Sequence, residues 1–358
     1  MFKGNKGEWG EIYAFCILLR NGILQAADEN LVPIKNIFFP IIKIIRGEYS
    51  YFPSKNQEEK IKVCYKNKSL VEFTTDVLDG IIKKLKKAIP EGKGAFEIKE
   101  CNDFFDFIKI NKIKANSTKK RDIEILIHDI NTGINTVCGF SIKSYLGSNP
   151  TLVNAGKSTN FKYQIEGCSE DIKTQFNMIN TQHKLIDRIS FLDDHGLCIT
   201  FTKETFSKQF KVNMRYIDTL MPQIMGECLL KFYTGKKGVK DVRNIIEEVA
   251  QTDKFQLECP DMYEYKMKLF LCACALGMTP EKKWVGGEDA NGGYITVKKD
   301  GSVVCFHIYN RTNFYDYLYN YTYFEKSSSS RHEYMSIFEE DGKYFINLNL
   351  QIRFKPHN

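Results

Sequence analysis

Residues 122–144 read DIEILIHDINTGINTVCGFSIKS, and this stretch decides the predicted fold. Every second residue from Ile123 to Ile127 is an isoleucine. A period of two predicts a half-buried β-strand, because successive side chains point to opposite faces of a sheet. The Asn- and Gly-containing sequence NTGIN predicts a turn, and TVCGFSIKS predicts a second strand. We therefore expect a β-hairpin here.

The polar face of this hairpin carries groups suited to phosphodiester hydrolysis. Asp122 begins the first strand, and Ser141 and Lys143 share one face of the second. Neighbouring strands lie roughly 4.8 Å apart, so the carboxylate and the amine are predicted to be close. A carboxylate can hold a divalent cation that activates water, and a lysine can assist the attack. The alternative is a chance pairing, since a lysine exposed on a strand is often only a solubilising residue.

The pattern resembles the PD-(D/E)xK nuclease fold, in which such a strand pair forms the core of the active site. The resemblance implies catalytic roles for Asp122 and Lys143 and a magnesium ion bound by Asp122. Ser141 stands where the pattern usually has a second acidic ligand. A known variation moves that carboxylate downstream of the lysine, but residues 154–157 read NAGK and contain no acid. The second carboxylate is therefore expected elsewhere in the chain.

A helix predicted over residues 7–22 offers this carboxylate. Its apolar residues recur at helical spacing, and Glu8 and Glu11 lie one turn apart on a shared face. Many nucleases of this fold have a glutamate on an N-terminal helix near the metal. Glu11 is our first candidate for catalysis and metal binding, Glu8 the second, and Glu124 the third. The alternative is that both helix residues are solvated acids at the positive end of the helix dipole.

The rest of the sequence predicts an α/β (mixed α+β) fold in which helices flank a mixed sheet. Residues 177–282 have mainly helical patterns, and GGYITVKKDGSVVCFHIYN (292–310) predicts a hairpin that turns at Lys-Asp-Gly. No linker divides the chain. We expect one domain over residues 1–358, with a catalytic core region at 1–165 and a β-rich region at 285–358 that contributes to DNA recognition.

Composition and charge narrow the cellular setting. The chain has 358 residues and a formal net charge of +7, which supports a polyanionic partner only weakly. Its eleven cysteines lack zinc-site spacing, so free thiols are expected. The charged N-terminus does not read as a signal peptide, and no apolar run approaches the roughly 20 residues of a membrane span. These features predict a cytoplasmic protein without a membrane partner.

Phrases along nearly the whole chain resemble the HpaII family of type II restriction endonucleases. They include NKGEWGEIY (5–13), GFSIKSYLGS (139–148), TLVNAGKSTNF (151–161), GGYITVKKDG (292–301) and SSSSRHEY (327–334). The resemblance implies a Mg²⁺-dependent enzyme that cuts double-stranded CCGG between the cytosines. It also implies a cognate methyltransferase as a genetic partner. A palindromic target favours a homodimer.

Reading CCGG requires hydrogen-bond donors that face guanine in the major groove. The segment from residue 307 to 332 is rich in tyrosine, serine and basic residues. We predict Arg331 and Arg311 as DNA contacts, with Asn310 and His332 beside them. An aromatic β-hairpin with a polar tip is the alternative.

Phosphate contacts are predicted in two further places. Lys157 and Asn160 follow directly after the catalytic strand. The run KINKIKANSTKKR (109–121) carries six basic residues and no acid, and includes Lys119 and Lys120. A solvated loop is the alternative for this run.

The leading hypothesis is thus a Mg²⁺-dependent restriction endonuclease. One alternative is a sequence-specific DNA-binding protein without catalysis, since Ser141 leaves the metal site one acid short. Another is a repair nuclease of the same fold. Incubation of the protein with a plasmid and Mg²⁺ would separate the three.

Overall fold

The computed structural model describes residues 2–357 except 55–58, 114–120, 131 and 236–237. Its described α-helices are α1 (Lys6–Asn21), α2 (Thr75–Glu91), α3 (Asn102–Phe107), α4 (Glu170–Met178), α5 (Lys184–Asp194), α6 (Lys208–Ile217), α7 (Met221–Thr234), α8 (Val242–Thr252), α9 (Asp261–Leu276), α10 (Arg311–Asn320) and α11 (Ser329–His332). Its described strands are β1 (Ile23–Ala27), β2 (Pro33–Arg46), β3 (Tyr49–Phe52), β4 (Lys60–Tyr65), β5 (Lys68–Thr74), β6 (Ile123–His128), β7 (Asn135–Ser144), β8 (Thr151–Val153), β9 (Asn160–Glu166), β10 (Cys198–Thr205), β11 (Gly293–Val297), β12 (Val303–His307), β13 (Thr322–Phe324), β14 (Ile337–Glu340), β15 (Lys343–Asn349) and β16 (Ile352–Phe354). The fold is mixed α+β with sheets flanked by helices, as the sequence predicted.

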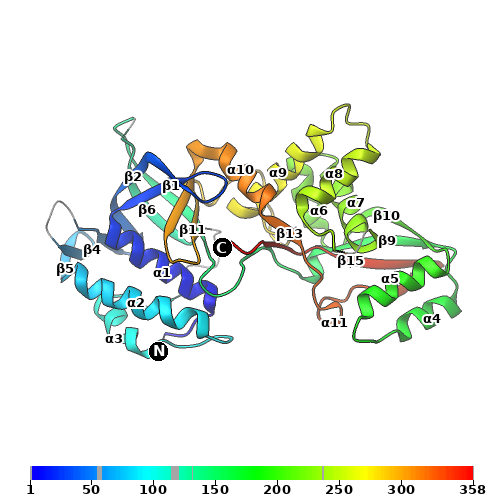
Figure 1. The fold of residues 1–358 in the computed structure, drawn as a ribbon, viewed down its shortest axis with the longest axis horizontal. Helices are drawn as coiled ribbons and strands as arrows, with labels where there is room; N and C mark the ends of the chain where they lie inside the picture. Colours follow the sequence, from blue (N-terminus) through cyan, green and yellow to red (C-terminus); the bar gives the residue numbers. More distant parts are fainter. Residues whose placement is uncertain (1, 55–58, 114–120, 131, 236–237, 358) are drawn as a thin grey trace.

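The first sheet has nine described strands in the order β1-β12-β11-β7-β6-β2-β3-β4-β5. Because β1 also pairs with β2, six of them close into a barrel-like ring, which the sequence pattern did not predict. The sheet is mixed: β6 pairs antiparallel with both β2 and β7, whereas β11 runs parallel to β7. Helices α1 and α2 lie side by side over this sheet (Figure 1).

The predicted hairpin at residues 122–144 is confirmed as β6 and β7. Their antiparallel register runs from Ile123 opposite Phe140 to His128 opposite Asn135. The isoleucines of β6 are buried and alternate with half-exposed residues, as the period of two predicted. They belong to the same apolar core as the buried side chains of α1. The hairpin is therefore fixed beneath this helix.

Helix α1 begins with a reciprocal cap. The Asn5 side chain accepts hydrogen bonds from the backbone N–H groups of Gly7 and Glu8, at 2.8 and 3.1 Å. The carboxylate of Glu8 in turn accepts from the Asn5 N–H at 2.8 Å. One turn into the helix, a Cβ atom on Gly10 would lie 2.3 Å from the Cβ of Ser144. Only glycine allows this close approach of α1 to the end of β7, and Glu11 follows directly.

The second half of the chain has its own apolar core and two smaller sheets (Figure 1). Strands β10-β9-β15-β14 form one sheet and β13-β16-β8 the other. The predicted helical middle region is largely confirmed by α5 to α9, with β10 as an exception. Residues 285–358 do not form one sheet. Strands β11 and β12 belong to the nine-stranded sheet, whereas β13 to β16 belong to the two smaller sheets.

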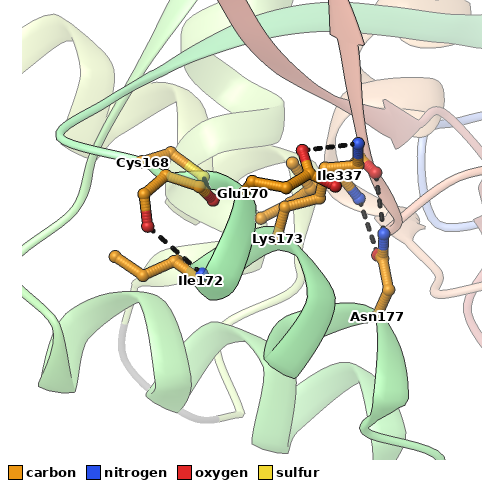
Figure 2. Close-up of polar contacts among 7 residues, drawn as sticks. Cys168, Glu170, Ile172, Lys173, Asn177 and Ile337 are labelled. Atoms are coloured by element: carbon orange, nitrogen blue, oxygen red, sulfur yellow. Dashed lines mark hydrogen bonds and ion pairs between the residues drawn. The ribbon is translucent and has the colours of Figure 1, made fainter.

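A buried arginine and an asparagine attach α4 and α5 to the start of β14. The Asn177 side chain donates to the Ile337 carbonyl at 2.8 Å and accepts from its N–H at 2.9 Å, as Figure 2 shows. Arg188 is 2% exposed, and its guanidinium donates to the carbonyls of Asn177 and Met335. These bonds hold the segment that follows α11, and so support the helix that carries Arg331.

The helices in the described ranges are too short or too polar to traverse a lipid bilayer.

Candidate active site

Asp122 lies at the start of β6 with its side chain turned toward β7. Its backbone N–H donates to the Phe140 carbonyl at 2.8 Å. Its carboxylate accepts from the backbone N–H of Ile142 at 2.7 Å and from the Ser141 hydroxyl at 3.3 Å. These donors fix the orientation of the carboxylate, which is the property that a metal ligand needs.

Ser141, which stands at the position of the second acid in the nuclease pattern, is hydrogen-bonded to Asp122. Its side chain is 1% exposed, and its hydroxyl donates to Asp122. The Ser141 hydroxyl thus helps to orient the Asp122 carboxylate and is not itself a metal ligand in this arrangement. Lys143 lies two residues further along β7, half-buried and opposite Thr296 of β11.

Glu11 shares this site with Asp122 and Lys143. The pKa of Glu11 is raised to about 8, first by burial and next by the negative charge of Asp122. The positive charge of Lys143 opposes this rise in pKa. Such interactions act between side chains in the same part of the molecule. The role of a glutamate from the first helix beside the hairpin stays a prediction.

The two other candidate acids have structural partners. Glu8 adds to the negative field at Glu11, but its carboxylate closes the N-terminal cap of α1. Glu124 forms an ion pair with Arg121 at 2.6 Å. Among the three candidates for the second carboxylate, Glu11 is thus the one whose pKa is raised by burial and by the charge of Asp122.

A magnesium ion fits the donors at this site. Within the described ranges, the structure holds no group of three or more His, Cys, Asp or Glu side chains arranged for a metal. Mg²⁺ does not require such a group, since it commonly takes one or two carboxylates and keeps several waters. Burial, and next the negative charge of Asp122, raise the pKa of Glu11. A divalent cation between the two carboxylates would relieve the repulsion between them.

The predicted base-reading residues differ in their availability. Arg331 is exposed on α11, with His332 half-buried beside it. Arg311 begins α10 and forms two bonds to the Glu288 carboxylate, at 2.6 and 2.7 Å. The side chain of Asn310 donates to the Ala27 carbonyl at 3.2 Å. The alternative of a β-hairpin in this segment is wrong, because residues 311–320 are helical.

Asn160 requires a correction, because it is 1% exposed and is not available to a phosphate in this conformation. Its amide donates to the His332 carbonyl at 2.9 Å and accepts from the Asn349 amide at 2.7 Å. Lys157 is exposed nearby and pairs with Glu333. Lys119 and Lys120 lie outside the described residues.

Sequence reasoning missed Arg46, the last residue of β2. This residue contributes a positive charge that opposes the rise in the pKa of Glu11. Strand β2 continues through Pro40 to Arg46. Its pairing with β6, far along the chain, brings Arg46 to the hairpin, and no local pattern in the sequence indicated this.

Comparisons with known proteins identify the family of this chain. The profile of the HpaII restriction endonuclease family matches residues 5–354. The type II restriction enzyme HpaII of Haemophilus parainfluenzae is 38% identical over 364 residues, which cover 99% of each chain. No solved structure matches the chain. At this identity the chain is a homologue of that enzyme and distinct from it. The chain belongs to the HpaII restriction endonuclease family.

Proposed function

We propose that this protein hydrolyses double-stranded DNA at CCGG between the two cytosines, with Mg²⁺ as cofactor. The observation that supports the catalytic centre is the packing of α1, which carries Glu11, against β7, which carries Lys143 and donates to Asp122. Membership of a family with a type II restriction enzyme as a relative supports the proposed target and cofactor.

The core of the site is a PD-(D/E)xK-type arrangement in this proposal. The antiparallel order β2-β6-β7, followed by the parallel strand β11, is compatible with such a mixed core. Ser141 takes over the second acidic position and orients Asp122. Glu11 then supplies the missing carboxylate from the N-terminal helix.

Each residue has a distinct role in the reaction. Asp122 and Glu11 hold the cation, and the bonds from Ile142 and Ser141 keep Asp122 in one orientation. Bound Mg²⁺ would supply positive charge at the scissile phosphate and lower the pKa of a water. Lys143 binds the phosphate and stabilises the negative charge that develops during attack.

Recognition involves a different part of the chain. Residues 1–165 carry catalysis in this proposal, together with β11 and β12, and residues 285–358 contribute to reading DNA. Arg331 is the best-exposed candidate for a base contact, and Lys157 for a phosphate contact. A palindromic target is served by a homodimer, and a cognate methyltransferase would protect the host genome.

The experiment is incubation of the purified protein with a plasmid that contains CCGG sites, with Mg²⁺ and with EDTA. We expect discrete fragments that end at CCGG and require Mg²⁺. Smearing would indicate a nonspecific nuclease of the same fold. A gel shift without cleavage would indicate a DNA-binding protein, the alternative that the serine at position 141 raises.

A further inference from the structure

We propose that Arg46 is a positioning residue of this centre, a fixed positive charge that offsets Glu11 and Asp122 before the metal binds. The inference rests on the proposed function, because it concerns the same carboxylates. It adds a third strand, β2, to the centre that α1 and the β6–β7 hairpin form.

The strand register places Arg46 at the site. β2 pairs with β6 with Ile45 opposite Glu124, so Arg46 lies beside the beginning of β6. Asp122 immediately precedes that strand. Arg46 is half-buried there and interacts electrostatically with Glu11.

Main-chain carbonyls fix the guanidinium. Arg46 donates to the carbonyl oxygens of Lys112 and Ile113, the latter at 2.9 Å. Ile113 in turn lies against the start of α1: a Cβ on Gly4 would be 3.1 Å from its side chain and 3.3 Å from the Cβ of Glu8. Arg46 thus connects β2 to the segment that packs against the N-terminus of α1.

These hydrogen bonds do not neutralise the positive charge of Arg46. Both acceptors are neutral carbonyls, so the positive charge acts on the carboxylates nearby. A guanidinium stays protonated even when burial disfavours its charge. In a site with little water, such a fixed charge interacts more strongly than one on the surface. It favours the ionised form of Glu11 and repels a cation that binds there.

This electrostatic role makes a prediction that a purely structural role does not. We expect Arg46→Gln to lower the melting temperature of the metal-free protein, because the carboxylates lose their counter-charge. In the same variant the dissociation constant for Ca²⁺ alone should fall about 3- to 10-fold, because the repulsion is gone. Calorimetric titration without DNA measures this affinity. Arg46→Lys keeps the charge and should bind Ca²⁺ as the wild type does.

Arg20 provides the matched control. It lies on α1, the helix that carries Glu11, but it pairs with Asp79 at 2.8 Å on a partly exposed surface. Arg20→Gln should leave the affinity for Ca²⁺ unchanged. If Arg46→Gln binds Ca²⁺ more weakly than the wild type or equally well, Arg46 is only a structural anchor and the inference is wrong. If Arg46→Gln does not fold, weaker Ca²⁺ binding by Arg46→Lys contradicts the inference in the same way.

Asp122→Asn separates this inference from the proposed function. Loss of Ca²⁺ binding in Asp122→Asn, without tighter binding in Arg46→Gln, would overturn the inference alone. Ca²⁺ binding by the wild type that does not depend on Asp122 would overturn the proposed metal site, and the inference with it.

Discussion

The β6–β7 hairpin and the segment from residue 307 to 332 were both singled out by their polar residues, yet they differ in how their sequences specify structure. In the hairpin, alternation fixed the face of each side chain, and the strands formed with the expected pairing. In the later segment the tyrosines from Tyr315 to Tyr323 also recur at every second position, yet a helix, α10, occupies the place of the alternative hairpin. Its Arg311 is bound to Glu288.

The difference shows what local sequence can specify. A strand that packs one face on a core must alternate, so its polar face is readable from the sequence. Aromatic residues serve equally in a helix, a strand or a surface that binds bases, so their presence alone does not choose among these. A functional residue on the hairpin is therefore a sharper hypothesis than one in the later segment.

The largest effect is expected in the hairpin itself. Lys143→Ala should lower the rate of cleavage by about 1,000-fold, because the charge on the phosphate in the transition state loses its partner. Binding to a CCGG duplex should stay nearly intact, since most of the interface is unchanged. Single-turnover rates and binding in Ca²⁺ measure the two properties.

Asp122→Ala should be equally inactive and should in addition lose the metal-dependent increase in DNA affinity. A Lys143→Ala protein that cuts at a rate comparable to the wild type would remove the hairpin from the catalytic site. The hairpin would then have a predictable structure without the predicted function.

The second prediction concerns the carboxylate contributed by α1. Glu11→Gln should lower the cleavage rate by at least about 100-fold, because the metal loses an orienting charge. The melting temperature of the metal-free protein should not fall, since burial and the charge of Asp122 disfavour the ionised form of Glu11. Single-turnover cleavage measures the rate, and thermal unfolding in EDTA measures the stability.

Two variants control for this change. Glu8→Gln weakens the cap of α1 and should cost no more than about 1 kcal/mol of stability, with little effect on cleavage. Ser141→Ala removes one of the donors to Asp122 and should matter less than Glu11→Gln. An active Glu11→Gln with an inactive Glu8→Gln would move the metal ligand one turn toward the N-terminus.

The candidate site was predictable where it depended on local pattern. Asp122 and Lys143 followed from alternation, and Glu11 from helical spacing together with the family's nuclease pattern. Arg46 and the closure of β1 on β2 were not predictable, because they depend on pairing between distant strands. Asn160 was misplaced for a related reason: its partners, at His332 and Asn349, come from far along the chain, and they bury it.

The third prediction sharpens the comparison within the later segment. Arg331→Ala should cost about 1–3 kcal/mol in binding to the CCGG duplex, with relaxed specificity at one base pair. Arg311→Ala should instead lose an ion pair that is partly exposed, a cost in stability below about 1 kcal/mol. Competition binding with cognate and random duplexes distinguishes them. Equal weakening on both duplexes by Arg331→Ala would make it a phosphate contact.

The smallest effect is a pH dependence of stability in the absence of metal. The pKa of Glu11 is raised from 4.5 to about 8 by burial and then by Asp122. Between these values the unfolded chain carries an ionised carboxylate, whereas the folded protein keeps the proton. The folded state therefore binds more protons, and its stability falls as the pH rises through this window.

Glu11→Gln cannot ionise, so its melting temperature in EDTA should decline less than that of the wild type between pH 5 and about 8. Glu8→Gln should retain most of the decline, because Glu8 is a smaller contributor to the pKa of Glu11 than burial and Asp122 are. A bound cation stabilises the ionised carboxylate, so saturating Ca²⁺ should remove the decline from the wild type. Thermal unfolding of the three proteins across this pH range measures the effect. Parallel curves for the wild type and Glu11→Gln would mean that Glu11 is not the buried acid of this site, and the α1 contribution to the catalytic hairpin would be wrong.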